Sequence, residues 1–132
     1  MTESVVRPTP TEGRRVGVGP GVPCLPMDVP EIDVAGLAKA RAEGAPLIDV
    51  REPDEYTAAH VPGAVLVPLA TVPVRLQDVP PGAPVYVICA VGQRSRRAAE
   101  FYRMRGIDAI NVAGGTTAWI EAGEPVSTGM EP

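Results

Sequence analysis

The sequence is poor in the residues that bind metals, form disulfides and stack on nucleic-acid bases. It has two cysteines, one histidine, and only one Trp, three Tyr and one Phe among its 132 residues. The two cysteines, Cys24 and Cys89, have 64 residues between them, so they form neither a disulfide framework nor a CxxC metal or redox motif. We therefore expect no bound metal and no cofactor.

Positive charge and long apolar runs are scarce as well. The formal net charge is -4, and Lys39 is the only lysine. An acidic chain with so few aromatic rings does not fit a general nucleic-acid binder. No apolar run approaches the roughly 18 residues of a membrane span, and the first ten residues lack the apolar stretch of a secretory signal. We expect a cytoplasmic protein that binds neither nucleic acid nor membrane.

The chain divides into an N-terminal arm and one domain. Residues 1–30 contain six prolines and four glycines and show neither helix nor strand periodicity. This composition predicts a flexible arm, with a short extended piece near 25–29 that docks on a sheet edge. Residues 31–129 are long enough for a single domain with its own core.

Short apolar runs alternate with helical patterns after the arm. Such alternation predicts an α/β domain with a mostly parallel central sheet. Strands are predicted over 46–50, 65–67, 85–88 and 110–112, and helices over 34–42, 95–105, 116–122 and a short segment that begins at Pro53. One or two helical turns, broken by Pro73, are predicted over 69–76. Asp33 is the expected cap of the first helix and Thr116 of the last. The helix over 95–105 is expected to face the core with Ala98, Phe101, Tyr102 and the stem of Arg105.

The loop from Cys89 to Ser95 is the strongest candidate for chemistry. Cys89 follows the predicted strand over 85–88, and sites in parallel sheets form at the carboxyl ends of strands. Gly92 supplies the backbone freedom for a tight turn. Such a turn can point successive N–H groups at one place beside a helix N-terminus. A cysteine that faces these groups has a lowered pKa and is largely thiolate.

Three arginines, Arg94, Arg96 and Arg97, crowd the first turn of the helix that follows. Cations there oppose the helix macrodipole, and a broken local rule without structural gain tends to mark a functional site. We infer that these arginines place positive charge at the entrance to the loop, where an anionic substrate would bind. The alternative is that Cys89 is a small buried hydrophobe at the end of a core strand.

The segment Cys-Ala-Val-Gly-Gln-Arg-Ser at 89–95 resembles the active-site loop of single-domain rhodaneses, which has the pattern C-x-x-G-x-R-S. Other segments agree in order: LIDVREPDEY at 47–56, HVPGAVLVP at 60–68, VYVIC at 85–89 and NVAGGTTAW at 111–119. The resemblance covers about residues 31–129. It implies a rhodanese-like fold, with a five-stranded, mostly parallel sheet flanked by helices.

Sulfur transfer is the activity that this resemblance implies. The thiolate of Cys89 would take the sulfane sulfur of an anionic donor such as thiosulfate and become a persulfide. It would then pass the sulfur to cyanide in vitro, or to a thiol or carrier protein in a cell. Arg94 would hold the donor, and the loop would surround the persulfide with Ala90, Val91, Gly92, Gln93 and Ser95. The alternative is a sulfur carrier, or a redox or sulfide sensor, with little free turnover.

Two features of the loop bear on its substrate. Four residues separate Cys89 from Arg94, one fewer than in cysteine-dependent phosphatases of this fold, and a tighter loop suits a sulfur atom better than a phosphate. Ala90 and Val91 stand where the family often has a basic residue and a hydroxyl. Without the hydroxyl, the persulfide would depend more on backbone donors. Without the basic residue, the loop entrance carries less positive charge for thiosulfate. Both changes leave room for a protein or low-molecular-weight persulfide as donor.

Asp49, Arg51 and Glu55 could form a charge network beside the loop, from which Arg51 could reach the substrate. The simpler interpretation of Arg51 is an ion pair that ties a strand to the next helix. The acidic run 52–55 is expected to be a solvated face.

Three more residues have a structural interpretation that is simpler than the functional one. His60 is expected to be a hydrogen-bonded turn residue, because transfer from a thiolate needs no dedicated base. Trp119 is expected in the core. Cys24 is expected to be an incidental thiol, although it could resolve an oxidised or persulfidated Cys89.

Overall fold

The computed structural model describes residues 29–80 and 84–132. Five strands form one sheet in the order β1-β5-β4-β2-β3, and every pair of neighbouring strands is parallel. The strands are β1 (Glu31–Ile32), β2 (Leu47–Asp49), β3 (Val65–Leu66), β4 (Val85–Ile88) and β5 (Ala109–Val112). The predicted α/β architecture is therefore confirmed, and the sheet is entirely parallel.

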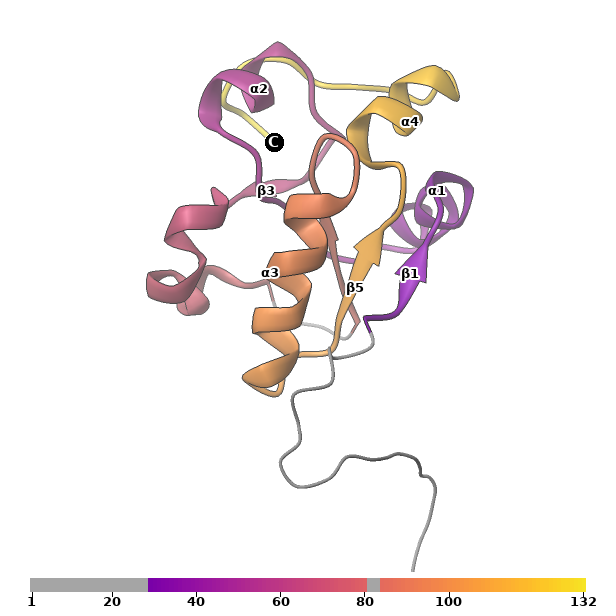
Figure 1. Ribbon diagram of the computed structural model, residues 1–132. Helices are drawn as coiled ribbons and strands as arrows, with labels where there is room; N and C mark the ends of the chain where they lie inside the picture. The colour runs from indigo at the N-terminus through magenta and orange to yellow at the C-terminus, as the bar shows by residue number, and fades with distance from the viewer. Residues whose placement is uncertain (1–28, 81–83) are drawn as a thin grey trace, which may run out of the picture.

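Helices cover both faces of this sheet (Figure 1). In the part of the chain that the structure describes, they are α1 (Val34–Ala42), α2 (Pro53–Ala58), α3 (Gln93–Met104) and α4 (Gly115–Glu121), with the 3-10 segments η2 (Leu69–Val74) and η3 (Leu76–Asp78). Helix α3 and η2 contribute to the core on one face. Helices α1, α2 and α4 contribute Leu37, Tyr56 and Trp119 to the core on the other.

Strand β4 lies at the centre and serves both cores. Its residues alternate, so Val85 and Val87 enter the core beside α3 while Tyr86 and Ile88 enter the other. All four are buried, as expected for a parallel strand covered on both sides. Cys89, the next residue along, continues the alternation and points toward the α3 side.

Local sequence signals fix several helix starts as predicted. The Asp33 side chain accepts a hydrogen bond from the Gly36 N–H at 2.8 Å and caps α1. Pro53 opens α2, where Glu52 and Glu55 form a capping box. These bonds satisfy N–H groups that a helix start would otherwise leave without acceptors.

Four local predictions were wrong. Helix α3 begins at Gln93 rather than residue 95, because Gly92, at φ +110°, ends the preceding turn. Gly114 rather than Thr116 caps α4. The segment 69–76 is a 3-10 helix only as far as Val74, with Pro73 inside it. Arg105 is exposed and lies over the ring of Phe101, 4.6 Å from its centroid.

The edge strand β1 was not predicted. It pairs with β5 at Glu31 and Ile32, just beyond the piece near 25–29 that was expected to dock on a sheet edge. Most of that piece, the rest of the proposed arm through residue 28, and Cys24 lie outside the described residues.

Candidate active site

The Cys89 sulfur lies inside the turn that joins β4 to α3. The Gly92 N–H donates to Sγ at 3.0 Å, and the Ser95 hydroxyl lies 3.3 Å from the same atom. The residue is only 1% exposed. The sulfur is therefore enclosed by polar hydrogens from its own loop, as the sequence predicted for a strand-to-helix turn.

Hydrogen bonding decides the ionisation of this thiol. Burial by itself raises the pKa of Cys89, but bonds from the Ser95 hydroxyl and from the N–H groups of Ser95, Gly92 and Val91 outweigh it. The net effect lowers the pKa of the thiol below its ordinary value. Hydrogen bonds to a charged form favour that form, so the loop favours the nucleophilic thiolate.

Helix α4 supports the turn from behind. The Thr116 N–H donates to the Cys89 carbonyl at 2.8 Å, and the Thr117 N–H donates to the Ala90 carbonyl at 3.0 Å. A Cβ on Gly115 would lie 2.5 Å from the Ala90 oxygen, and Gly115 has φ +61°. The glycine pair at 114–115 thus lets two helix-terminal N–H groups reach the loop carbonyls.

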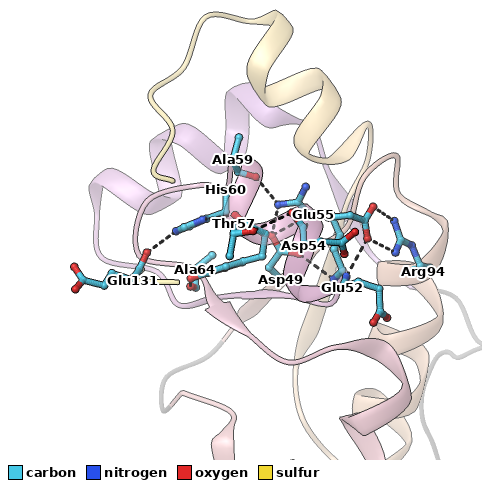
Figure 2. A network of polar contacts seen from close by, with 12 residues as sticks. Asp49, Glu52, Asp54, Glu55, Thr57, Ala59, His60, Ala64, Arg94 and Glu131 are labelled. Carbon is cyan, nitrogen blue, oxygen red and sulfur yellow. Dashed lines mark hydrogen bonds and ion pairs between the residues drawn. The ribbon is translucent and has the colours of Figure 1, made fainter. Parts of the chain in front are cut away.

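Arg94 forms a two-pronged ion pair with Glu55 of α2, as Figure 2 shows. The two N–O distances are 2.8 and 2.9 Å, and each side chain is about one-third exposed. The bond from Arg94 holds the pKa of Glu55 at about 2, and Glu55 in turn raises the pKa of Arg94. The prediction that run 52–55 is only a solvated face was therefore wrong for Glu55.

The remaining loop residues line the turn at different depths. Ser95 is buried beneath the sulfur, Ala90 and Gly92 are half-buried, and Val91 and Gln93 are exposed. Val91 is 57% exposed, so an apolar side chain lies at the surface of the loop.

Arg51 faces away from solvent and toward Asp49. Its Nη2 donates to Asp49 Oδ2 at 2.9 Å and to the Ala59 carbonyl at 2.7 Å. Both side chains of the ion pair are buried. The geometry matches the interpretation of an ion pair that ties β2 to the end of α2.

His60 is a buried residue of the turn after α2. Its ring stacks on Tyr56 with a centroid separation of 3.6 Å. The two ring nitrogens lie 2.8 Å from the carbonyl oxygens of Tyr56 and Glu131, the second of which is drawn in Figure 2. This is the hydrogen-bonded role expected from the sequence, and Trp119 is likewise buried in the core as expected.

Two polar residues at the site were missed. Asn111 Oδ1 of β5 accepts a hydrogen bond from the Ser95 hydroxyl at 2.5 Å. Glu31 Oε2 of β1 accepts a hydrogen bond from Asn111 Nδ2 at 2.9 Å. An amide within the otherwise apolar run Ala109–Val112 is the sequence signal that could have drawn attention to the first. Nothing local to Glu31 could have identified it, since it meets Asn111 across 80 positions of sequence.

Within residues 29–80 and 84–132, no group of three or more His, Cys, Asp or Glu side chains is arranged to hold a metal ion. In the same residues, no helix has both the length and the apolar character required to cross a membrane.

Comparison with known proteins identifies the family. The model of the rhodanese-like domain matches residues 34–122. The chain belongs to the rhodanese-like family. A solved rhodanese-related protein from Thermoplasma volcanium shares 30% identity, with a TM-score of 0.70, over 77% of this chain and 99% of that one. The fold is therefore the rhodanese-like fold, in agreement with the sequence resemblance.

Two relatives of this rhodanese-like domain are named for roles in sulfur chemistry. A sulfurtransferase of Allochromatium vinosum is 32% identical over 101 residues, which are 74% of this chain and 94% of that protein. YrkF of Bacillus subtilis, a proposed sulfur carrier protein, is 35% identical over 94 residues, which are 69% of this chain but 51% of that protein. The family to which the chain belongs thus includes both sulfurtransferases and proteins named as sulfur carriers.

Proposed function

We propose that this rhodanese-like protein is a sulfurtransferase that carries sulfur as a persulfide on Cys89. The observation that carries the proposal is the enclosure of Cys89 Sγ by the Gly92 N–H and the Ser95 hydroxyl, beside Arg94. These groups stabilise negative charge on sulfur before and after transfer. The lowered pKa of the thiol supplies the nucleophile that such a reaction needs.

In the first half-reaction, the Cys89 thiolate attacks the outer sulfur of an anionic donor such as thiosulfate. A new S–S bond forms at Sγ as the S–S bond of the donor breaks, and its electron pair leaves with sulfite. In the second, cyanide, a thiol or a carrier protein takes the outer sulfur and returns the thiolate. The cycle needs no external oxidant or reductant.

Arg94 is the proposed binding group for the anionic donor. Its guanidinium is about one-third exposed and lies close enough to Cys89 to interact with the charge on sulfur. Glu55 already occupies both prongs of its fork. A bound anion would therefore share Arg94 with Glu55 or displace it.

A second candidate within the same family is a sulfur carrier or sensor, which acquires one sulfur atom as a persulfide and keeps it until a partner accepts it. The likeness to YrkF supports this candidate. Both proposals include a cytoplasmic location, where a reactive thiol stays reduced.

Intact-protein mass spectrometry after brief incubation with thiosulfate tests the proposal. The wild type and Cys24→Ser should each gain one sulfur atom that cyanide removes, while Cys89→Ser should gain none. Thiocyanate produced in large molar excess over protein would establish a turnover enzyme, and one equivalent would favour the carrier. Sulfur that remains on Cys89→Ser, or a wild type that no thiosulfate or persulfidated thiol charges, would contradict the persulfide route.

A further inference from the structure

Asn111 is a polar side chain in the middle of the sheet. It lies on β5 opposite Val87 of β4 and is only 1% exposed. A buried amide is costly unless its donors and acceptor all find partners. The partners of Asn111 connect the edge strand β1 to the serine beneath the reactive sulfur.

Two acceptors fix which way the amide faces. Asn111 Nδ2 donates to Glu31 Oε2 at 2.9 Å and to the Gly92 carbonyl at 3.2 Å. Glu31 is itself held by Arg96, at 3.3 Å. Because neither partner of Nδ2 can donate a hydrogen bond when Glu31 is ionised, the amide cannot be reversed. Its oxygen must face Ser95.

Ser95 then has one proton and two acceptors. Its Oγ lies 2.5 Å from Asn111 Oδ1 and 3.3 Å from Cys89 Sγ. A hydroxyl donates a single hydrogen at a time, and the shorter contact to the better acceptor retains it while the sulfur is neutral. Turning the hydroxyl toward an ionised sulfur leaves the buried Asn111 oxygen without this donor.

We propose that Asn111 is a positioning residue that holds the Ser95 proton away from Cys89 Sγ until the sulfur carries negative charge. The inference rests on the proposed function for its use in sulfur transfer. During sulfur transfer, Asn111 competes for the Ser95 proton and so weakens the stabilisation of the Cys89 thiolate. This preserves the nucleophilicity of the sulfur, because a thiolate becomes less nucleophilic as it is stabilised.

The charged groups around the sulfur are separate from this effect. Arg94 on α3 interacts electrostatically with Cys89 and is paired with Glu55 on α2. Asp49 and Arg51, after β2, form their own buried pair. Glu31 on β1 is paired with Arg96 on α3 and is linked to Ser95 through Asn111. Substituting Asn111 or Ser95 leaves all of these charges in the chain.

The test measures the rate at which iodoacetamide alkylates Cys89 as a function of pH, in a Cys24→Ser background. Asn111→Leu keeps a similar volume but has no acceptor for the Ser95 proton. At a pH where wild-type Cys89 is mostly thiol, this variant should be alkylated roughly threefold faster. The freed hydrogen bond raises the thiolate fraction about tenfold, and the lower nucleophilicity of the more stabilised thiolate offsets about half of that gain on a logarithmic scale. Ser95→Ala should be alkylated more slowly, and Ser95→Ala with Asn111→Leu should match Ser95→Ala alone.

This pattern separates positioning from simple damage to the loop. If Asn111 only supported the Gly92 carbonyl, its loss would loosen the turn and slow alkylation in both backgrounds, which would overturn the proposal. A faster rate that persists in the Ser95→Ala background would overturn it too. Asn111→Ala, with the same expected direction, replaces the leucine variant if that protein does not fold, as judged by circular dichroism.

The readout is independent of sulfur transfer. Alkylation needs no sulfur donor, so a protein that shows the predicted pattern but never acquires a persulfide would contradict the proposed function and leave the role of Asn111 intact. A protein that is persulfidated normally but fails the double-variant comparison would contradict the role of Asn111 alone.

Discussion

The ion pair of Glu55 and Arg94 is a contact between single residues that has a measurable pH dependence. The pKa of Glu55 is about 2 in the folded protein, against an ordinary value of 4.5. The folded state therefore prefers the ionised carboxylate. Its contribution to stability is fully present above about pH 4.5 and is lost as the pH falls toward 2.

Glu55→Gln should remove this contribution. Because both side chains are about one-third exposed, solvent screening limits the loss in free energy of unfolding to about 1 kcal/mol near neutral pH. In urea titrations at several pH values, the difference from wild type should shrink to nothing near pH 2. Glu121→Gln, at an exposed position of α4, is the control. A difference that stays constant down to pH 2 would show that the ion pair is not its source.

At the scale of elements, the junction of β5 and α4 determines where the Cys89 loop sits. Gly114 and Gly115 carry φ +84° and +61°, and the loop carbonyls approach Gly115 so closely that no Cβ fits. The two N–H groups of Thr116 and Thr117 then hold the carbonyls of Cys89 and Ala90. The helix thus depends on two glycines to support the turn.

Gly115→Ala should therefore destabilise the protein and disturb the loop together. A positive φ and the contact with the Ala90 oxygen together cost about 2 to 4 kcal/mol, measured by urea unfolding. Gly123→Ala is the matched control, since Gly123 has φ +79° but nothing within 4 Å of the added carbon; it should cost only about 1 kcal/mol. Alkylation of Cys89 should change in the first variant and not in the second. Equal losses in both would mean that close approach to the loop is unimportant.

At the scale of the whole molecule, the sheet separates two cores, and a buried tyrosine hydroxyl has a hydrogen-bond partner in one of them but not in the other. Tyr56, in the core under α1, α2 and α4, donates to the Ala64 carbonyl at 2.5 Å. Tyr102, in the core under α3, is fully buried, and its hydroxyl has no hydrogen-bond partner among the described residues. Burial raises the pKa of Tyr102 to about 12, but the neutral hydroxyl still carries a desolvation cost.

Tyr102→Phe should accordingly raise the free energy of unfolding by about 1 kcal/mol, because it removes a buried polar group that makes no bond. Tyr56→Phe should lower it by about 1 kcal/mol, because it leaves the Ala64 carbonyl without its donor. Thermal and urea unfolding of the pair give a direct comparison of one substitution on opposite faces of the sheet. If Tyr102→Phe destabilises the protein as much as Tyr56→Phe does, the Tyr102 hydroxyl makes a hydrogen bond in solution and the prediction is wrong.

Much of the molecule follows from short stretches of sequence. The apolar run Val85–Ile88 specifies a strand buried on both sides, Asp33 caps α1, and Pro53 with the capping box starts α2. Each of these acts over a few residues, through backbone sterics or a local hydrogen bond. The loop from Cys89 to Ser95 is also local, because its donors and its sulfur lie within six positions of each other. Its assignment as the active site stays a prediction, as do the domain limits at residues 30 and 129.

Contacts between distant residues were decided only by the tertiary structure. Glu55 meets Arg94 across 39 positions, Ser95 meets Asn111 across 16, and Asn111 meets Glu31 across 80. No local pattern encodes such pairs, because they depend on the strand order β1-β5-β4-β2-β3, which places β5 between β1 and β4. The sequence by itself determined most of the helices and strands, because capping, turn and apolar patterns act over a few residues, and it placed the Cys89–Ser95 loop between β4 and α3. The order in which the sheet joins those elements decided the distant contacts, because it brought Asn111 to Ser95, Glu31 to Asn111 and Glu55 to Arg94.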